Sequence, residues 1–419
     1  MAYEPPVAPA PPMTPPHGPE PVPLYGDEFA AHPHATYDLL RTYGALAPVE
    51  IAPGVNALLV TEYRAALDVL QNREGVWTKD SRGWEQTIAP DSPVYPMLAD
   101  RPNPLHRDGE EHDRYRQVIA DGFHKIEPHV MRRQVHELAD NLIIRFGGAG
   151  TADLVEEYAA QLPLLLFNRL VGLPDESSSR LITALSGVME ASADAAAGAA
   201  AYDAFLAELT QTKKRNPGQD LTSWFLEHPR GLSDAEVAHQ IALAIGAGYE
   251  PTAHLIGNAL ARMLSDDRYY RTLTNGSLTP ADAIRDVFHN EPPLANYAWH
   301  YPKRDLLFHG TWLRAGQLVL ISFAAANTQF GQVQPGSSGG GAHLSWSAGP
   351  HACPVPRHAL LIATTAIERL TALLSDVHLA VPYAELEWRR GPFVRGLAHL
   401  PVAFTPLSAS DATPWRPAG

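Results

Sequence analysis

The sequence predicts a mainly α-helical fold with a small β part. Most of its apolar residues recur at helical spacing, and the longest such segment covers residues 233–264. Short runs of strand-like composition lie near both ends, at residues 55–61 and within residues 377–405. A length of 419 residues allows one large domain or two ordinary ones. No internal repeat is present, and we predict a single domain.

This domain is expected to cover residues 24–406. Ten prolines fall within residues 1–23, which favours an extended and disordered tail. A proline-rich ligand for a partner domain is the alternative for this segment, but a plain tail suits it better. Residues 407–419 are expected to form a second, C-terminal tail.

The first half of the domain is expected to contain a strand at residues 55–61 and then a helix at 62–71. Residues 76–103 have several prolines and no clear period, so we predict a long irregular loop, which in compact domains is usually functional. Its aromatic residues suit a substrate pocket and core packing about equally; they are Trp77, Trp84 and Tyr95. Helices are then predicted at residues 110–119, 128–146, 153–171 and 178–209.

The second half is expected to be helical up to the adjacent prolines Pro292 and Pro293. Its helices are predicted at residues 220–228, 233–264 and 280–289. Beyond the prolines we expect strands within 306–321, a glycine- and serine-rich loop at 335–341, a helix at 356–374, and short strands and turns over 377–405.

Composition excludes several classes of protein. The net charge of −14 argues against nucleic acid as a partner. No run of about twenty apolar residues indicates a membrane span, and the N-terminus does not have the pattern of a secretory signal. A single cysteine and no export signal predict a cytoplasmic location.

That single cysteine, Cys353, is the most informative residue. It cannot form a disulfide within the chain or a multi-cysteine metal site, which leaves a nucleophile, a buried apolar residue or an axial ligand to haem iron. It lies just before a predicted helix, whose N-terminal dipole stabilises a thiolate. Trp346, Gly349 and His351 precede it at short spacings, and these neighbours favour the ligand.

The segment that contains Cys353 resembles the haem loop of the cytochrome P450 family, Phe-x-x-Gly-x-x-x-Cys-x-Gly. Here it is Trp346-x-x-Gly349-x-x-x-Cys353-x-Val355, so it departs from the family at Val355. The resemblance covers roughly residues 24–406 and is to bacterial, soluble members. It implies the P450 fold, a haem b cofactor with Cys353 as the thiolate ligand, and electrons from a ferredoxin and its reductase, because the chain has no flavin or nicotinamide motif.

Four residues are candidates for holding the haem propionates. His112 and Arg116 lie four positions apart and therefore share one face of a helix. Taken alone, this spacing indicates a charged helix face exposed to solvent. The same spacing resembles the family's His-x-x-x-Arg. By resemblance, His300 and His351 occupy the positions of two further propionate donors.

A second motif lies within the long apolar helix. Ala247 and Gly248 match the family's small residues, which are expected to leave open space above the iron for oxygen and substrate. Glu250 and Thr252 match the family's proton relay. Pro251 takes the place of the first threonine, and proline removes a helix hydrogen bond and kinks the segment. The alternative is a structural kink, but a carboxylate in an apolar helix is costly to bury without a function.

The prolines around the cysteine suggest a hypothesis about the iron. Pro354 and Pro356 have no N–H to offer the sulfur, which leaves Val355 as the main donor. Fewer donors should make the thiolate more electron-rich and the reduction potential lower. A redox titration after replacing both prolines should show a higher potential, and an unchanged one would contradict the hypothesis.

The family's Glu-x-x-Arg pair is missing. Alignment on Pro292 and Pro293 puts Asp286 and His289 in its place, and the usual nearby arginine is also absent. The chain resembles a minority bacterial branch of the family in three features: the missing Glu-x-x-Arg pair, the Glu-Pro-Thr motif and the Cys-Pro-x-Pro loop.

The sequence therefore predicts activation of O2 and hydroxylation of a small organic molecule, with a role in secondary metabolism. Oxidative cross-linking of aromatic residues in a short peptide is one alternative, because radical coupling demands less of the weakened proton relay. A haem-containing but non-catalytic partner in a signalling complex is another, and a haem-free helical protein is the least consistent with the matched positions.

Overall fold

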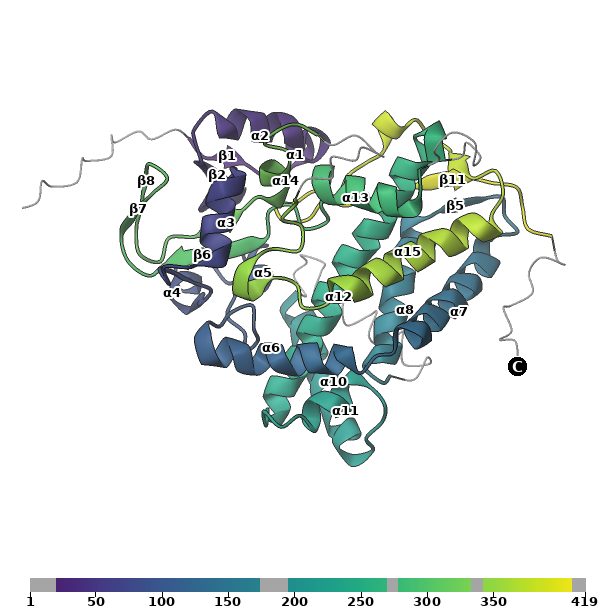
Figure 1. The fold of residues 1–419 in the computed structure, drawn as a ribbon, viewed down its shortest axis with the longest axis horizontal. Coiled ribbons are helices and arrows are strands. Elements are labelled where there is room, and N and C mark those ends of the chain that lie inside the picture. Colours follow the sequence, from purple (N-terminus) through teal and green to yellow (C-terminus); the bar gives the residue numbers. More distant parts are fainter. Residues whose placement is uncertain (1–19, 174–194, 270–277, 333–341, 409–419) are drawn as a thin grey trace, which may run out of the picture.

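The computed structural model describes residues 20–173, 195–269, 278–332 and 342–408. Its helices form the larger part of the molecule, and a mixed sheet with short helices lies at one side (Figure 1). The predicted tail over residues 1–19, most of the helix predicted at 178–209, the loop at 335–341 and the end of the chain lie outside these residues. The predicted mainly α-helical fold with a small β part is confirmed.

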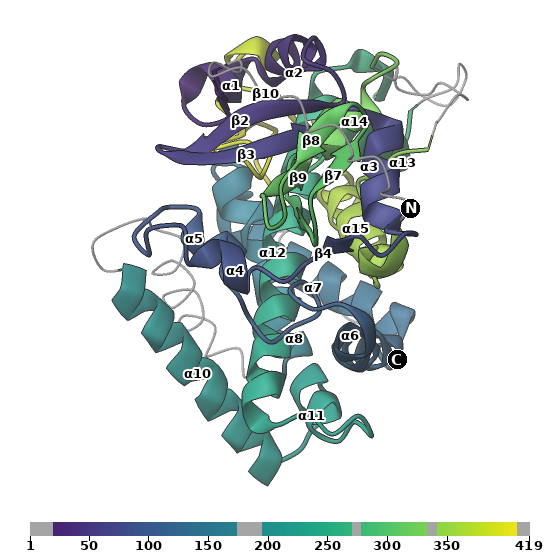
Figure 2. The ribbon, with the colours of Figure 1, turned by 90° about the vertical axis from the view of Figure 1, so that its left-hand side faces the viewer.

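Helix α12, Asp234–Leu264, is the central element of the helical part (Figure 2). Ser233 and Glu236 form a capping box that fixes its start. Its most extensive contacts are with α8 (Gln161–Leu170), α10 (Ala195–Arg215), α13 (Pro280–Asn290) and α15 (Pro356–Leu373). The remaining large helices are α6 (Gly109–His124), α7 (Pro128–Phe146) and α11 (Leu221–Leu226). Among the described residues, no helix is long and apolar enough to cross a bilayer.

The main sheet has six strands in the order β1-β2-β3-β9-β6-β4. Strands β2 and β3 form an antiparallel hairpin, and β3 pairs in parallel with β9. The strands are β1 (Val22–Pro23), β2 (Leu46–Ala52), β3 (Val55–Val60), β4 (Trp77–Thr78), β6 (Ala298–Pro302) and β9 (Val319–Ile321). Because β4 and β6 are neighbours, the sheet brings the segment after residue 78 next to His300.

Short elements complete the fold. A three-stranded sheet combines β10 (His378–Leu379), β11 (Pro401–Ala403) and β5 (Thr151–Asp153), and β7 (Leu306–Phe308) forms a hairpin with β8 (Thr311–Leu313). Short helices cover the main sheet; they are α1 (Asp27–Ala31), α2 (Pro33–Arg41), α3 (Tyr63–Gln71) and α14 (Phe323–Asn327).

Three of the predictions about individual segments are wrong. Val22–Pro23 pairs with β2 and is not part of a tail, because an edge strand tolerates proline. The predicted loop at 76–103 contains β4 and two one-turn helices, α4 (Arg82–Glu85) and α5 (Tyr95–Leu98). The single helix predicted at 153–171 is divided into a π-helical turn, Val155–Ala159, and α8.

A buried ion network joins the end of α13 to three other parts of the chain. The Glu291 carboxylate accepts a hydrogen bond of 2.7 Å from Arg395 Nε and lies 3.4 Å from His34 Nε2. Arg262 of α12 lies between Glu291, at 3.9 Å, and Asp286, at 3.1 Å. Removing one partner from such a network leaves an uncompensated buried charge. The network therefore fixes α13 against α12 and the two terminal regions.

Glu291 should make the stability of the protein depend on acidity. Burial raises the pKa of Glu291, but the contacts with His34 and Arg395 outweigh burial and lower the pKa to about 2. A lowered pKa stabilises the fold above the ordinary glutamate value near 4.5, and this contribution is lost as pH falls from there towards 2. It amounts to on the order of 3 kcal/mol. Urea unfolding of Glu291→Gln at pH 7 and pH 3 should show a smaller acid loss than the wild type.

The matched control is Glu28→Gln, which replaces an exposed carboxylate on α1. This variant should keep the wild-type dependence on pH. An equal acid loss in Glu291→Gln and the wild type would show that Glu291 does not contribute.

Candidate active site

A cavity of about 250 Å³, partly open to solvent, lies in the helical part of the molecule. It is lined by α12, by α6, by β6 and by the segment from Ser345 to the start of α15. Nine of the predicted site residues line it: His112, Arg116, Ala247, Gly248, Thr252, His300, Trp346, His351 and Cys353. Residues 241 positions apart in the sequence therefore meet at one site.

Cys353 faces this cavity from a loop fixed by its own backbone. Its N–H donates a 2.8 Å hydrogen bond to the carbonyl of Trp346. Burial raises the pKa of the Cys353 thiol, whereas the backbone N–H of Val355 and the charge of Arg116 lower it. Val355 is thus a donor to the sulfur, and the adjacent prolines have no N–H to add.

Gly349 does not line the cavity but fixes the course of this loop. Its φ is +67°, and a Cβ atom at this position would lie 2.3 Å from the carbonyl oxygen of Leu70 at the end of α3. Only glycine combines this conformation with so close an approach between backbones. The ring of Trp346 packs on Phe288 of α13, with centroids 4.7 Å apart. The loop is therefore held from both sides.

The four candidate propionate donors come together at the cavity. His112 and Arg116 lie one turn apart on α6, and the ring centroids of His112 and His351 are 4.3 Å apart. Nε2 of His112 and Nδ1 of His300 are buried without a hydrogen-bond partner among the described residues. Buried polar atoms are normally paired, so unpaired nitrogens that face a cavity indicate an acceptor on a bound group.

The cavity face of α12 carries Ala247, Gly248, Pro251 and Thr252. The helix continues through Pro251 without ending. Gly248 does not leave open space as we expected, because a Cβ atom there would lie 1.9 Å from the ring of Phe167. The glycine instead allows the α8 side chain Phe167 to reach the cavity wall.

Glu250 points away from the cavity lining. Its carboxylate lies 3.6 Å from His254 Nε2 and 3.8 Å from Arg389 Nη2. Burial raises the pKa of Glu250, but His254 and Arg389 outweigh burial and lower it. Because Arg389 is 46% exposed, Glu250 is close to the surface and one residue in sequence from the cavity face of the helix.

Other lining residues could not be recognised in the sequence. Lys79, Phe167, Tyr297 and Trp299 line the cavity, yet none lies in a motif. The aromatic residues of the predicted 76–103 loop have other places. Trp77 and Trp84 pack in the cores beneath the sheet, and Tyr95 begins α5 away from the lining.

The donor set fits haem. A thiol opens on the cavity, four imidazole or guanidinium groups offer contacts to two carboxylates, and the remaining wall is largely apolar. A flat apolar ring with a thiolate-binding metal and two propionates satisfies all three features. It would also supply the acceptors that the unpaired nitrogens of His112 and His300 lack.

Comparisons with known proteins agree with this site. No protein-family model matches the chain. It is 28% identical over 394 residues to the cytochrome P450 monooxygenase PikC of Streptomyces venezuelae, covering 90% of this chain and 92% of PikC. It is 26% identical over 400 residues to the vitamin D(3) 25-hydroxylase of Pseudonocardia autotrophica, covering 92% and 97%. The solved structure of CYP154A1 from Streptomyces coelicolor A3(2) matches with a TM-score of 0.81 at 26% identity, covering 92% of this chain and all of that one.

These relatives support the assignment of the chain to the cytochrome P450 family. Membership implies a haem cofactor with a cysteine thiolate ligand and an enzyme of the P450 monooxygenase type. The predicted P450 fold is confirmed by the match to the solved structure of CYP154A1. The single cysteine of the chain lies on the cavity described above.

The contact between Gly248 and Phe167 can be tested by substitution. Gly248→Ala should lower the free energy of unfolding by about 1–3 kcal/mol, because the added methyl group overlaps the ring. Adding Phe167→Leu should recover part of this loss, since leucine leaves room. Urea unfolding of both variants measures the effect.

Gly257→Ala on the same helix is the control, because a Cβ atom there meets nothing closer than 3.7 Å. It should be neutral or slightly stabilising. Equal effects at positions 248 and 257 would contradict the described contact.

Proposed function

We propose that this protein hydroxylates a small organic molecule, using dioxygen and electrons from a ferredoxin and its reductase in the cytoplasm. The observation that carries the proposal is the position of Cys353, the only cysteine, on a cavity that also gathers His112, Arg116, His300 and His351. The names of similar proteins support the reaction class; besides PikC and the vitamin D(3) 25-hydroxylase they include the nocardicin C N-oxygenase of Nocardia uniformis.

Each residue has a proposed role. Cys353 ligates haem b, which when bound supplies an iron centre for dioxygen activation. His112, Arg116, His300 and His351 hold its propionates. Trp346 and Gly349 keep the cysteine loop in place through their contacts with α13 and α3.

Protons are proposed to enter along α12. Glu250 takes them up near the exposed Arg389, and the Thr252 hydroxyl, which faces the cavity, holds a proton or an ordered water there. Ala247 and the Gly248–Phe167 contact form the wall beside Thr252. Carboxylates and hydroxyls at such positions serve in general acid–base catalysis.

We further propose that the network of Asp286, Arg262, Glu291 and Arg395 replaces the missing Glu-x-x-Arg brace. Asp286 stands where the family has glutamate, and its ion pair at 3.1 Å is with Arg262 of α12. The pairing thus crosses between helices. His289 instead lies beside His343, with ring centroids 5.1 Å apart.

The substrate is expected to be mainly apolar. The cavity wall includes aliphatic and aromatic side chains of α12, β6 and the 104–105 segment, among them Leu105, Leu243, Leu255 and Tyr297. The named relatives are oxygenases, and they do not favour oxidative cross-linking of a peptide or a non-catalytic haem partner.

The reaction is tested by turnover with labelled dioxygen and a surrogate ferredoxin system on a library of apolar small molecules and aromatic peptides. Mass spectrometry should show a product that has gained one labelled oxygen atom, and none with Cys353→Ala. A product that has only lost two hydrogens would support cross-linking instead. No turnover of any compound despite a fully haem-loaded and reducible protein would favour the non-catalytic partner.

A further inference from the structure

Lys79 is a buried lysine in the wall of the cavity. It follows β4 directly and is 3% exposed. Its ammonium donates a 2.7 Å hydrogen bond to the carbonyl of Trp299 and lies 4.1 Å from the centroid of the Trp299 ring. Both residues line the cavity. A fully buried lysine in such a place needs a reason, because lysines are almost never buried unless paired.

No carboxylate lies within ion-pair distance of this ammonium among the described residues. Asp108, whose charge acts on this ammonium, is engaged elsewhere. It accepts hydrogen bonds from the Thr78 hydroxyl, at 2.6 Å, and the Lys79 backbone N–H, at 2.9 Å, and lies 3.5 Å from His351 Nε2. One carbonyl and one aromatic face do not compensate the burial of a charge. Burial accordingly lowers the pKa of Lys79 to about 7, although Asp108 raises it.

The lysine belongs to the same end of the cavity as the unpaired histidine nitrogens. Burial holds the pKa of His300 well below its ordinary value, and the charge of Lys79 lowers it further. The charge of Lys79 also acts on His351. The pairing of Thr78 with Tyr301 places Lys79 beside His300 in the sheet. Asp108 contacts both the Lys79 backbone and His351. One anionic partner can therefore be shared by Lys79 and the two histidines.

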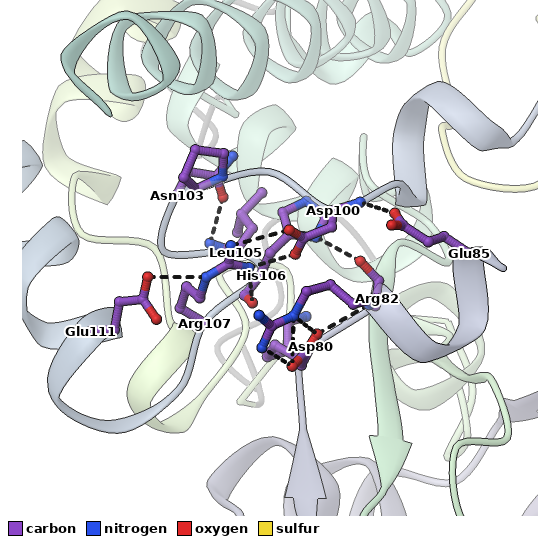
Figure 3. A network of polar contacts seen from close by, with 12 residues as sticks. Asp80, Arg82, Glu85, Asp100, Asn103, Leu105, His106, Arg107 and Glu111 are labelled. Carbon is purple, nitrogen blue, oxygen red and sulfur yellow. Dashed lines mark hydrogen bonds and ion pairs between the residues drawn. The ribbon is translucent and has the colours of Figure 1, made fainter. Parts of the chain in front are cut away.

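The segment that follows Lys79 is held in position by a network of polar contacts. Figure 3 shows this network. Arg107 binds the Asp100 carboxylate at 2.5 and 3.1 Å and Glu111 at 3.2 Å, and Glu85 accepts from the Asp100 N–H at 2.7 Å. The whole 79–111 stretch is thereby tied to the start of α6.

We propose that Lys79 binds a carboxylate of a molecule held in the cavity, next to His112, Arg116, His300 and His351. The inference rests on the proposed haem-binding function of this cavity. The carboxylate belongs either to a haem propionate or to an acidic substrate. Both supply the anion that the buried ammonium lacks, and a charge-assisted hydrogen bond forms in either case.

The test uses the haem-loaded protein and three variants of Lys79. Lys79→Met removes the charge at similar volume, Lys79→Gln removes it but keeps a donor for the Trp299 carbonyl, and Lys79→Arg keeps the charge. Lys303→Met is the matched control, because the Lys303 ammonium also donates to a carbonyl, that of Gly75 at 3.0 Å, but is exposed. Two quantities are measured: the rate of haem transfer to apomyoglobin, and the spectral affinity for dodecanoic acid and for its methyl ester.

If a propionate is the partner, the Met and Gln variants should release haem about tenfold faster or more, and the Arg variant and Lys303→Met should resemble the wild type. If a substrate carboxylate is the partner, haem release should stay unchanged, and the neutral variants should lose about tenfold in affinity for the acid but not for the ester. Should Lys79→Met fail to fold, Lys79→Gln decides.

The proposal would be overturned if both neutral variants, Lys79→Met and Lys79→Gln, released haem at the wild-type rate and also kept the wild-type preference for dodecanoic acid over its methyl ester. The proposed function would be left intact by that result. A wild-type protein that takes up no haem would overturn both, and the two failures are thus distinguishable.

Discussion

The structure depends on a group of buried donor side chains that face one cavity, where Nε2 of His112 and Nδ1 of His300 have no hydrogen-bond partner among the described residues. His112, His300 and His351 are held there by α6, β6 and the cysteine loop, and burial lowers the pKa of each histidine. Such an arrangement is unfavourable in an empty apolar pocket. It becomes favourable when an anionic, flat and largely apolar group fills the space. A haem that fills this cavity would therefore also stabilise the fold.

The rest of the fold positions these side chains and the Cys353 thiol at the same cavity. Gly349 lets the cysteine loop approach the end of α3, and Trp346 packs on α13. The α13 helix is in turn held by the ion network of Glu291 and Arg395. Contacts that pass through three elements thus lead from the loop of Cys353 to the terminal regions of the chain. The missing Glu-x-x-Arg pair does not leave α13 without electrostatic support, since Arg262 comes to it from α12.

The sequence was most informative where function demands a local pattern. The spacing of His112 and Arg116, the lone Cys353 and the long apolar helix each predicted an element or a site residue that the structure brings together. The bounds of α7 and the start of α15 also agree with the helical period. Prediction failed where long-range contacts decide. Nothing near Lys79 indicates burial, because its cover comes from Trp299, 220 residues later. Likewise Gly248 was taken as open space, and only the packing of α8 shows that Phe167 occupies it.

The central claim is that Cys353 ligates a haem in this cavity. The most direct test is the absorbance spectrum of the purified protein after reduction with dithionite and exposure to carbon monoxide. The account predicts the strongly red-shifted Soret band of a thiolate–haem–carbon monoxide complex in the wild type, and its loss in Cys353→Ala. A wild type without haem, or with only the band typical of a neutral axial ligand, would contradict it.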